Sequence, residues 1–203
     1  MYNDIVHAAS ATAAELGGRL PTGLQRYHAF RDLRSKRTYI ACFAPEKMVK
    51  QLIPRCLCKL DVCTGNDAIN EITRRDHWKL RVDLYNRQYN VTYAEYEDFW
   101  IEDETNNYRL QLGTYRGTAG DSLTYHKEKA FSTTDRKNNG PNSPDCANRH
   151  QGAWWFDNCL SSHLNGLNLN GRHDRAGQGV IWQTFGGVQD SLIFSEMKIN
   201  LMT

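Results

Sequence analysis

The residues best placed to do chemistry lie in one stretch, where two cysteines enclose a pair of adjacent tryptophans. Cys146 and Cys159 bracket the sequence Ala-Asn-Arg-His-Gln-Gly-Ala-Trp-Trp-Phe-Asp-Asn, and Leu-Ser-Ser-His-Leu-Asn-Gly follows. Large aromatic side chains in a loop need a cross-link or an apolar cluster to fix them, because ordering a loop costs conformational entropy. The stretch therefore indicates a recognition site built on loops.

The same stretch contains the residue types of a hydrolytic triad, in Asp157, Ser161 and His163. No nucleophile-turn motif frames Ser161, and a histidine beside such a loop more often serves as a structural hydrogen-bond donor. We therefore predict no catalytic residues and no enzymatic activity.

Four further cysteines lie before residue 64, at Cys42, Cys56, Cys58 and Cys63. Thiolates are zinc ligands, but a Cys-x-Cys pair without a second tight pair fits one tetrahedral ion poorly. Unpaired or irregularly paired thiols are therefore expected ahead of zinc, and the pairing of these cysteines stays open.

Composition excludes some partners. The 203 residues are 40% hydrophobic and 24% charged, with a net charge of +2, which suits one core, or one core and a small satellite. So small a charge gives no field that would favour nucleic acid or an anionic membrane. No apolar run approaches the ~18 residues that span a bilayer, so no membrane insertion is expected.

Periodicity predicts a few regular elements. Residues 5–16 and 67–74 have helical spacing, and residues 78–84 and 91–96 alternate as two strands of an antiparallel hairpin that turns at residues 86–88. Further strands are predicted over residues 107–112 and 191–199. Residues 113–187 are rich in Gly, Asn, Asp, Ser and Thr and indicate long loops.

Several short motifs occur in an order and spacing that is specific when taken together. They are Gly-Asn-Asp-Ala-Ile at 65–69, Leu-Arg-Val-Asp-Leu at 80–84, Tyr-Ala-Glu-Tyr at 93–96, Asn-Tyr-Arg-Leu at 107–110, Gly-Thr-Ala-Gly-Asp-Ser-Leu at 117–123, Phe-Ser-Thr at 131–133 and Glu-Met-Lys-Ile at 196–199. With the tryptophan stretch, they resemble the fibrinogen C-terminal-like domain of ficolins, tachylectins, angiopoietins and tenascins.

This resemblance implies an α+β fold, with a twisted antiparallel sheet subdomain and a disulfide-held, loop-rich binding subdomain. It covers residues 64–203, while residues 1–63 stay unassigned and do not resemble the first part of the family's domain. The chain is therefore expected to be N-terminally truncated or rearranged. The last strand, or a neighbour, would then expose unpaired backbone groups, so the expected outcome is either aggregation or a substitute strand from residues 30–60.

The resemblance also implies that Cys146 and Cys159 form a disulfide, which presumes an oxidising compartment. A secreted, extracellular protein is expected, although no signal peptide is visible in the sequence. The peptide bond before the first cysteine, here Asp145–Cys146, is often cis in the family. Asn90 begins the Asn-Val-Thr glycosylation sequon.

The family's calcium loop usually carries alternating aspartates shortly before the first cysteine. Here Asp135 is followed by Lys137 and Asn139 where further carboxylates are expected. Calcium needs several hard oxygen ligands, and an ammonium group repels it. We predict no tight calcium site and no cofactor, with the hypothesis that Lys137 itself acts as a tethered cation.

The ligand pocket of the family lies beside the first cysteine of the bridge. Leu160 follows the second cysteine, where a histidine is common, while Arg149 and His150 replace an aromatic or a polar pair and favour a carboxylate or sulfate. The adjacent tryptophans, Trp154 and Trp155, are interpreted chiefly as core. The expected ligand-binding residues are Cys146, Arg149, His150, Leu160, His163 and Trp182.

The predicted function is a non-catalytic extracellular recognition module. Its loops over residues 135–185 would bind a glycan, an acetylated or anionic ligand, or a protein receptor. The alternatives are a structural matrix or adhesion component and an incomplete product that binds nothing. The sequence contains no heptads or Gly-x-y repeats that would encode an oligomer.

Overall fold

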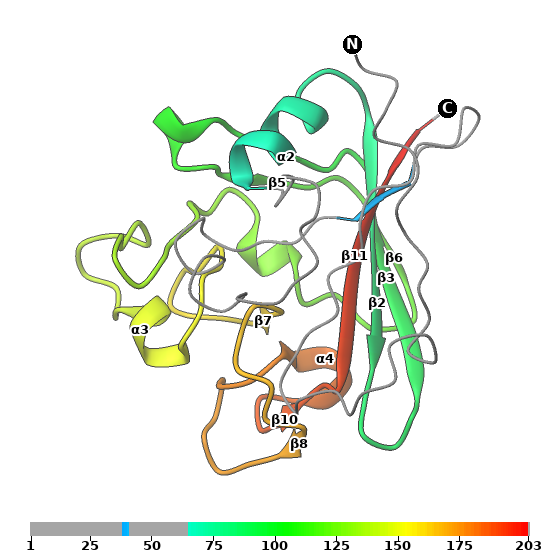
Figure 1. Ribbon diagram of the computed structural model, residues 1–203, viewed down its shortest axis with the longest axis vertical. Coiled ribbons are helices and arrows are strands. Elements are labelled where there is room, and N and C mark those ends of the chain that lie inside the picture. The colour runs from blue at the N-terminus through cyan, green and yellow to red at the C-terminus, as the bar shows by residue number, and fades with distance from the viewer. Residues whose placement is uncertain (1–37, 41–64, 203) are drawn as a thin grey trace, which may run out of the picture.

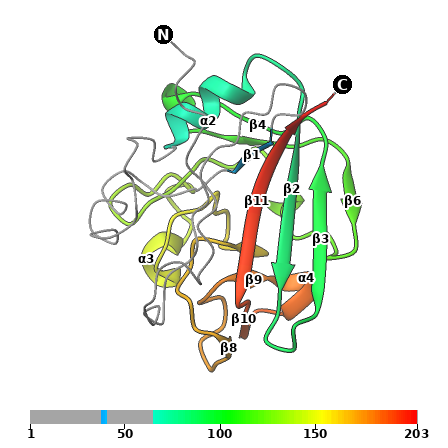
Figure 2. The same cartoon turned by 45° about the vertical axis from the view of Figure 1, so that its right-hand side comes forward.

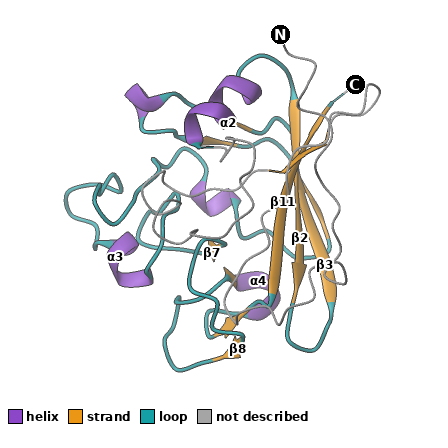
Figure 3. Ribbon diagram, viewed as in Figure 1, coloured by secondary structure: helices purple, strands orange, loops and turns teal. Residues whose placement is uncertain are grey.

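A computed structural model describes residues 38–40 and 65–202 (Figure 1). The helix predicted over residues 5–16 and the four cysteines before residue 64 lie outside these ranges. The long strands stand together on one side of the molecule, and the long loops extend from the other (Figure 3). No helix in the described ranges has the length and apolar character that a membrane crossing requires.

A five-stranded antiparallel sheet supports the molecule, with the strand order β1-β11-β2-β3-β6. Its strands are β1 (Thr38–Ile40), β11 (Phe194–Leu201), β2 (Trp78–Tyr85), β3 (Val91–Tyr96) and β6 (Tyr115–Gly117). Figure 2 shows β11, β2 and β3 side by side, with β11 reaching the sheet from the far end of the chain.

The β2–β3 hairpin forms as predicted, because its apolar residues alternate. Leu80, Val82 and Leu84 are fully buried, and Leu80 and Val82 lie opposite Tyr96 and Ala94 on β3. Period-two alternation places these side chains on one face of the sheet, toward the core. The sequon residue Asn90 lies exposed just before β3, and its glycosylation stays a prediction.

The other face of the sheet carries an ion-pair network. Asp83 accepts hydrogen bonds from Lys198 Nζ at 2.7 Å and from Arg81 Nε at 2.9 Å. Burial opposes ionisation of this carboxyl group, but the bonds from Lys198 and Arg81 outweigh it and hold the pKa of Asp83 below its ordinary value. The network ties β2 to β11.

The strand predicted within residues 30–60 is present beside β11. β1 pairs antiparallel with β11 and brings Tyr39 opposite Ile199. Residues 38–40 fall inside the predicted window of 30–60, so β11 lies between two strands and does not form the edge of the sheet.

Two strand predictions were wrong in extent. The strand expected over 107–112 shortens to β5 (Leu110–Gln111), which pairs with β4 (Trp100–Ile101) outside the central sheet. Asn107 and Tyr108 have φ of 52° and 51°, which extended backbone does not allow. The strand expected over 191–199 divides into β10 (Asp190–Ser191) and β11, and β11 runs on to Leu201.

The remaining elements are short. The helix predicted over 67–74 forms one residue earlier, as α2 (Asn66–Thr73). The others are η1 (Glu104–Asn106), η2 (Thr124–His126), α3 (Cys146–His150), β7 (Ser162–His163), β8 (Gly171–Arg172), β9 (Ile181–Trp182) and α4 (Gln183–Gly186). Because these elements are so short, side chains and the loops themselves must hold the loop region in shape.

Candidate functional site

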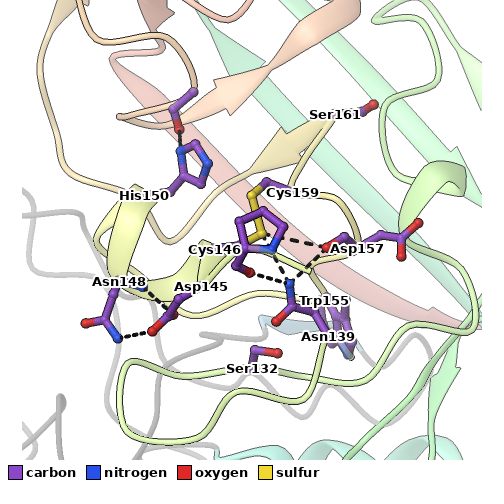
Figure 4. Close-up of a disulfide and its surroundings, with 12 residues drawn as sticks. Ser132, Asn139, Asp145, Cys146, Asn148, His150, Trp155, Asp157, Cys159 and Ser161 are labelled. Atoms are coloured by element: carbon purple, nitrogen blue, oxygen red, sulfur yellow. Dashed lines mark hydrogen bonds between the residues drawn. A yellow bond between two sulfur atoms is a disulfide. The ribbon is translucent and has the colours of Figure 1, made fainter. Parts of the chain in front are cut away.

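The loop region is fastened by the expected disulfide. Cys146 opens helix α3 and is bonded to Cys159, with their Cα atoms 5.4 Å apart (Figure 4). Asp145 caps the helix by accepting the backbone N–H of Asn148, and Gln151 ends it in the left-handed conformation with φ of 56°. No cis peptide bond occurs in the described ranges, so Asp145–Cys146 is trans.

The two tryptophans between the cysteines form the core of the loop region. Trp154 and Trp155 are fully buried, and their rings pack edge to face with centroids 5.1 Å apart. The backbone of Trp154 exchanges two hydrogen bonds with Ser132, and Trp155 Nε1 donates to the carbonyl of Tyr108 at 2.7 Å. Their interpretation as core is confirmed.

His126 joins three parts of this core and was not singled out from the sequence. The fully buried ring places Nδ1 2.7 Å from the carbonyl oxygen of Trp155. Its Nε2 accepts the backbone N–H groups of Ser161 and Ser162 at 3.2 and 3.0 Å. This pattern requires a neutral ring protonated on Nδ1, and burial lowers the pKa of His126 to about 4.

His163 is buried in the same core but makes fewer hydrogen bonds than His126. A Cβ on Gly152 would lie 2.6 Å from its Nε2, so the glycine permits a close approach of backbone to ring. Neither ring nitrogen has a hydrogen-bond partner among the described residues. Burial, with smaller contributions from the neighbouring His150 and His126, lowers the pKa of His163 to about 3.

The segment before Cys146 is closed by the amide of Asn139. Its Nδ2 donates to the carbonyls of Pro144 and Asp157, each at 2.9 Å, and contacts Cys146 Sγ at 3.3 Å. One buried amide therefore ties this segment to both sides of the disulfide, as Figure 4 shows. The sequence had suggested only that Asn139 was a lost calcium ligand.

The donor set of this segment does not fit calcium. Lys137 Nζ donates to the carbonyl of Pro141 at 3.3 Å, and the carboxylate of Asp135 accepts a hydrogen bond from Thr133 Oγ1 at 2.6 Å. The Asn139 amide presents its nitrogen to the surrounding carbonyls. A cation at this place would meet one carboxylate, an ammonium group and N–H donors.

We therefore expect the melting temperature to change by less than about 1 °C between chelator and millimolar calcium, because the residues around Asp135 do not offer the oxygen ligands through which calcium would stabilise the folded state. Thermal unfolding of the whole chain measures this. Lys137→Asp restores a carboxylate near Asp135 and is expected to gain a calcium-dependent rise. Micromolar calcium binding by the unaltered protein in calorimetry would contradict the prediction.

The structure places the six predicted ligand-binding residues at different depths. The side chains of Cys146, His163 and Trp182 are buried, His150 is 5% exposed, Leu160 is partly buried and Arg149 is exposed. Arg149 is thus the member most accessible to a ligand, and we predict that the buried members act only through the shape of the surface. Their role in binding stays a prediction.

Helix α3 is tied to the loop over residues 175–178. His150 Nδ1 lies 2.9 Å from the carbonyl oxygen of Gly177, and Gln178 Nε2 donates to the carbonyl of Arg149 at 3.2 Å. Arg175 Nη1 approaches Gln178 Oε1 at 3.5 Å. Sequence reasoning missed Arg175 and Gln178, since they lie about 26 residues beyond α3 with no motif linking them.

The residues considered for catalysis do not form a triad. Asp157 is paired with Lys129 at 3.3 Å, and His163 makes no hydrogen bond to Ser161 within the described residues. His126, rather than His163, accepts the Ser161 backbone N–H. A base oriented toward a nucleophile is missing from this group.

Removing the disulfide is expected to lower the free energy of unfolding by about 3 kcal/mol, because the bridge closes a short loop in the unfolded chain. Urea unfolding of the Cys146→Ser, Cys159→Ser double variant measures this by tryptophan fluorescence. Reductant added to the double variant measures any separate contribution of the remaining cysteines, which is then subtracted. A loss below about 1 kcal/mol would contradict the prediction.

Comparison with known proteins identifies the domain. The family model for the C-terminal globular domain of fibrinogen beta and gamma chains matches residues 56–202. Techylectin-5A from Tachypleus tridentatus is 41% identical over 139 residues, which cover 68% of this chain and 47% of that protein. Human Tenascin-R is 42% identical over 135 residues, 66% of this chain and 10% of that protein.

Solved structures agree with these relatives. The fibrinogen-like globe domain of human ANGPTL6 has a TM-score of 0.65 and 36% identity, covering 68% of this chain and 63% of that one. Lamprey fibrin D-dimer, in complex with the peptide ligand Gly-His-Arg-Pro-amide, has a TM-score of 0.64 and 28% identity, covering 68% and 49%. The chain spans less than half the length of Techylectin-5A and a tenth of Tenascin-R. It belongs to the family of the fibrinogen C-terminal globular domain.

Proposed function

We propose that this domain is a non-catalytic extracellular recognition module, and that it binds a glycan through the loops over residues 135–185. The single observation that carries the proposal is the disulfide-bonded loop with its buried core. Trp154, Trp155 and His126 are fixed by hydrogen bonds, so the exposed residues above them are held in place before a ligand arrives. Such pre-organisation lowers the entropy cost of binding.

The comparisons support a glycan as the first ligand to test. Techylectin-5A carries a lectin name and is 41% identical. The peptide-bound fibrin structure supports a protein receptor as the second, since its ligand is a peptide. The absence of an oriented base at Ser161 supports a binding role over catalysis. The disulfide supports an extracellular location, because such bonds persist in oxidising compartments.

A glycan array probed with the whole chain, secreted from cells that form disulfides, tests the proposal. The array should contain neutral, N-acetylated and acidic glycans, each with and without calcium. Binding to a defined subset is expected, with no calcium requirement.

A bulky residue on the loop surface locates the site. Asn158 is exposed between the cysteines, and Asn158→Trp is expected to weaken binding at least about tenfold by covering the surface. Arg116→Trp on the edge strand β6 is the matched control and should bind normally. Equal binding by both variants would move the site away from the disulfide loop.

A structural matrix or adhesion role is the second candidate, favoured by the similarity to Tenascin-R. A matrix or adhesion role predicts a different result. The folded protein would bind no glycan on the array and would still be retained on a deposited extracellular matrix. That result would replace the glycan proposal.

A further inference from the structure

The side chain of Gln178 connects two segments that each carry an exposed arginine, Arg149 and Arg175. Arg149 lies in the last turn of helix α3, and Arg175 lies in the loop between β8 and β9. Gln178 contacts both, through its Nε2 to the Arg149 carbonyl at 3.2 Å and through its Oε1 to Arg175 Nη1 at 3.5 Å. The bond between His150 and the carbonyl of Gly177 holds the same loop against the helix, as the close-up in Figure 4 shows for the ring of His150.

The charges of these arginines are not neutralised within the described ranges. Both side chains are exposed, and neither forms an ion pair with another described residue. Asp145 accepts from the Asn148 amide at 2.8 Å, and Asp157 is paired with Lys129.

We propose that Arg149 and Arg175, which Gln178 links through the Arg149 carbonyl and the Arg175 guanidinium group, form a subsite for the sulfate or carboxylate group of an acidic glycan. The proposal rests on the proposed glycan-binding function and specifies the chemistry of the ligand. A planar guanidinium group donates two parallel hydrogen bonds to an oxyanion, and two such groups match a tetrahedral sulfate better than a single ammonium does. The hydrogen bond from Gln178 to the Arg149 carbonyl limits the movement of the last turn of helix α3.

The subsite favours an oxyanion over an amine or a neutral sugar. A cationic ligand would meet two unpaired positive charges, and a neutral ligand would leave both guanidinium groups to water. Because the side chains are exposed, salt screens the attraction, so affinity should fall as ionic strength rises. A neutral acetylated glycan has no such dependence.

Surface plasmon resonance with the whole chain and three defined oligosaccharides tests the proposal. Chitotetraose is neutral, a hyaluronan tetrasaccharide adds carboxylates, and a chondroitin sulfate tetrasaccharide adds sulfates. Tighter binding of one or both acidic probes supports the proposal, and the comparison of the two identifies the oxyanion that the arginines prefer.

Charge-removing variants assign the effect to these residues. Arg149→Gln and Arg175→Gln are each expected to weaken binding of the acidic probe about tenfold, as the loss of charged hydrogen bonds implies. Arg116→Gln removes the same charge from β6 and should leave the affinity unchanged, since its pair with Glu97 is exposed. Gln178→Leu keeps both charges and is expected to weaken binding by a smaller factor, which reports positioning.

The possible failures are distinguishable. Chitotetraose bound as tightly as the acidic probes, with the arginine variants unaffected, would overturn the oxyanion subsite and leave glycan recognition standing. If the folded protein bound none of the three oligosaccharides, both the oxyanion subsite and the proposed glycan-binding function would be overturned. An oligoglutamate peptide bound in preference to every glycan would overturn the subsite's assignment to a glycan.

Discussion

Replacing His126 by alanine is expected to lower the free energy of unfolding by about 4 kcal/mol, through a lost buried side chain and unsatisfied backbone groups. The carbonyl of Trp155 loses its donor, and the N–H groups of Ser161 and Ser162 lose their shared acceptor. All three lie under the disulfide loop, where water does not replace the ring easily. Urea unfolding monitored by tryptophan fluorescence measures the loss.

A second histidine provides the control for this experiment. His77 pairs with Asp98 at 2.9 Å, but its side chain is 83% exposed. His77→Ala is therefore expected to change the free energy of unfolding by less than about 0.5 kcal/mol. Comparable losses for the two variants would show that the three bonds of His126 contribute little.

The sheet could be predicted from the sequence because its physical signal is local. Leu80, Val82 and Leu84 alternate with polar residues, so the pleat alone assigns them to one face. The substitute strand β1 followed from a different argument, that β11 needs a hydrogen-bonding neighbour on its free side. That argument predicted only a range, residues 30–60. Which three residues pair with β11 depends on long-range contacts that the sequence does not reveal.

The third strand was mispredicted because backbone conformation overrode a favourable pattern. Asn107 and Tyr108 adopt positive φ, and the carbonyl of Asn107 accepts the N–H of Phe131. A tyrosine rarely adopts this conformation, so nothing in its type indicates a break in the strand.

In the candidate site, too, some features could be predicted from the sequence and others could not. The disulfide could be anticipated from the family resemblance, and the burial of the two tryptophans from their residue type. His126 and Asn139 could not, because their partners are backbone carbonyl and N–H groups contributed by distant segments. Every residue has such groups, so residue types carry no sign of these bonds.

Two buried histidines are expected to make the domain less stable as the pH falls below 6.5. Burial lowers the pKa of His126 to about 4 and that of His163 to about 3, while unfolded histidine titrates near 6.5. Between these values the unfolded chain binds protons that the folded one excludes, so stability is complete above pH 6.5 and falls as the pH decreases. At pH 5 the two rings together account for a loss of about 4 kcal/mol relative to pH 7.5.

Urea midpoints between pH 7.5 and 5 measure this slope. The groups facing the rings are known, with Asp157 and Lys129 near His126, and His150 near His163. His163→Leu removes one titrating ring that has no hydrogen-bond partner among the described residues, so it is expected to halve the loss at pH 5. Asp83→Asn should leave the slope unchanged in this window, because the lowered pKa of Asp83 makes that group matter only at lower pH. A flat profile above pH 5 would mean that these rings accept protons within the fold, and that their burial is not what stabilises the neutral form.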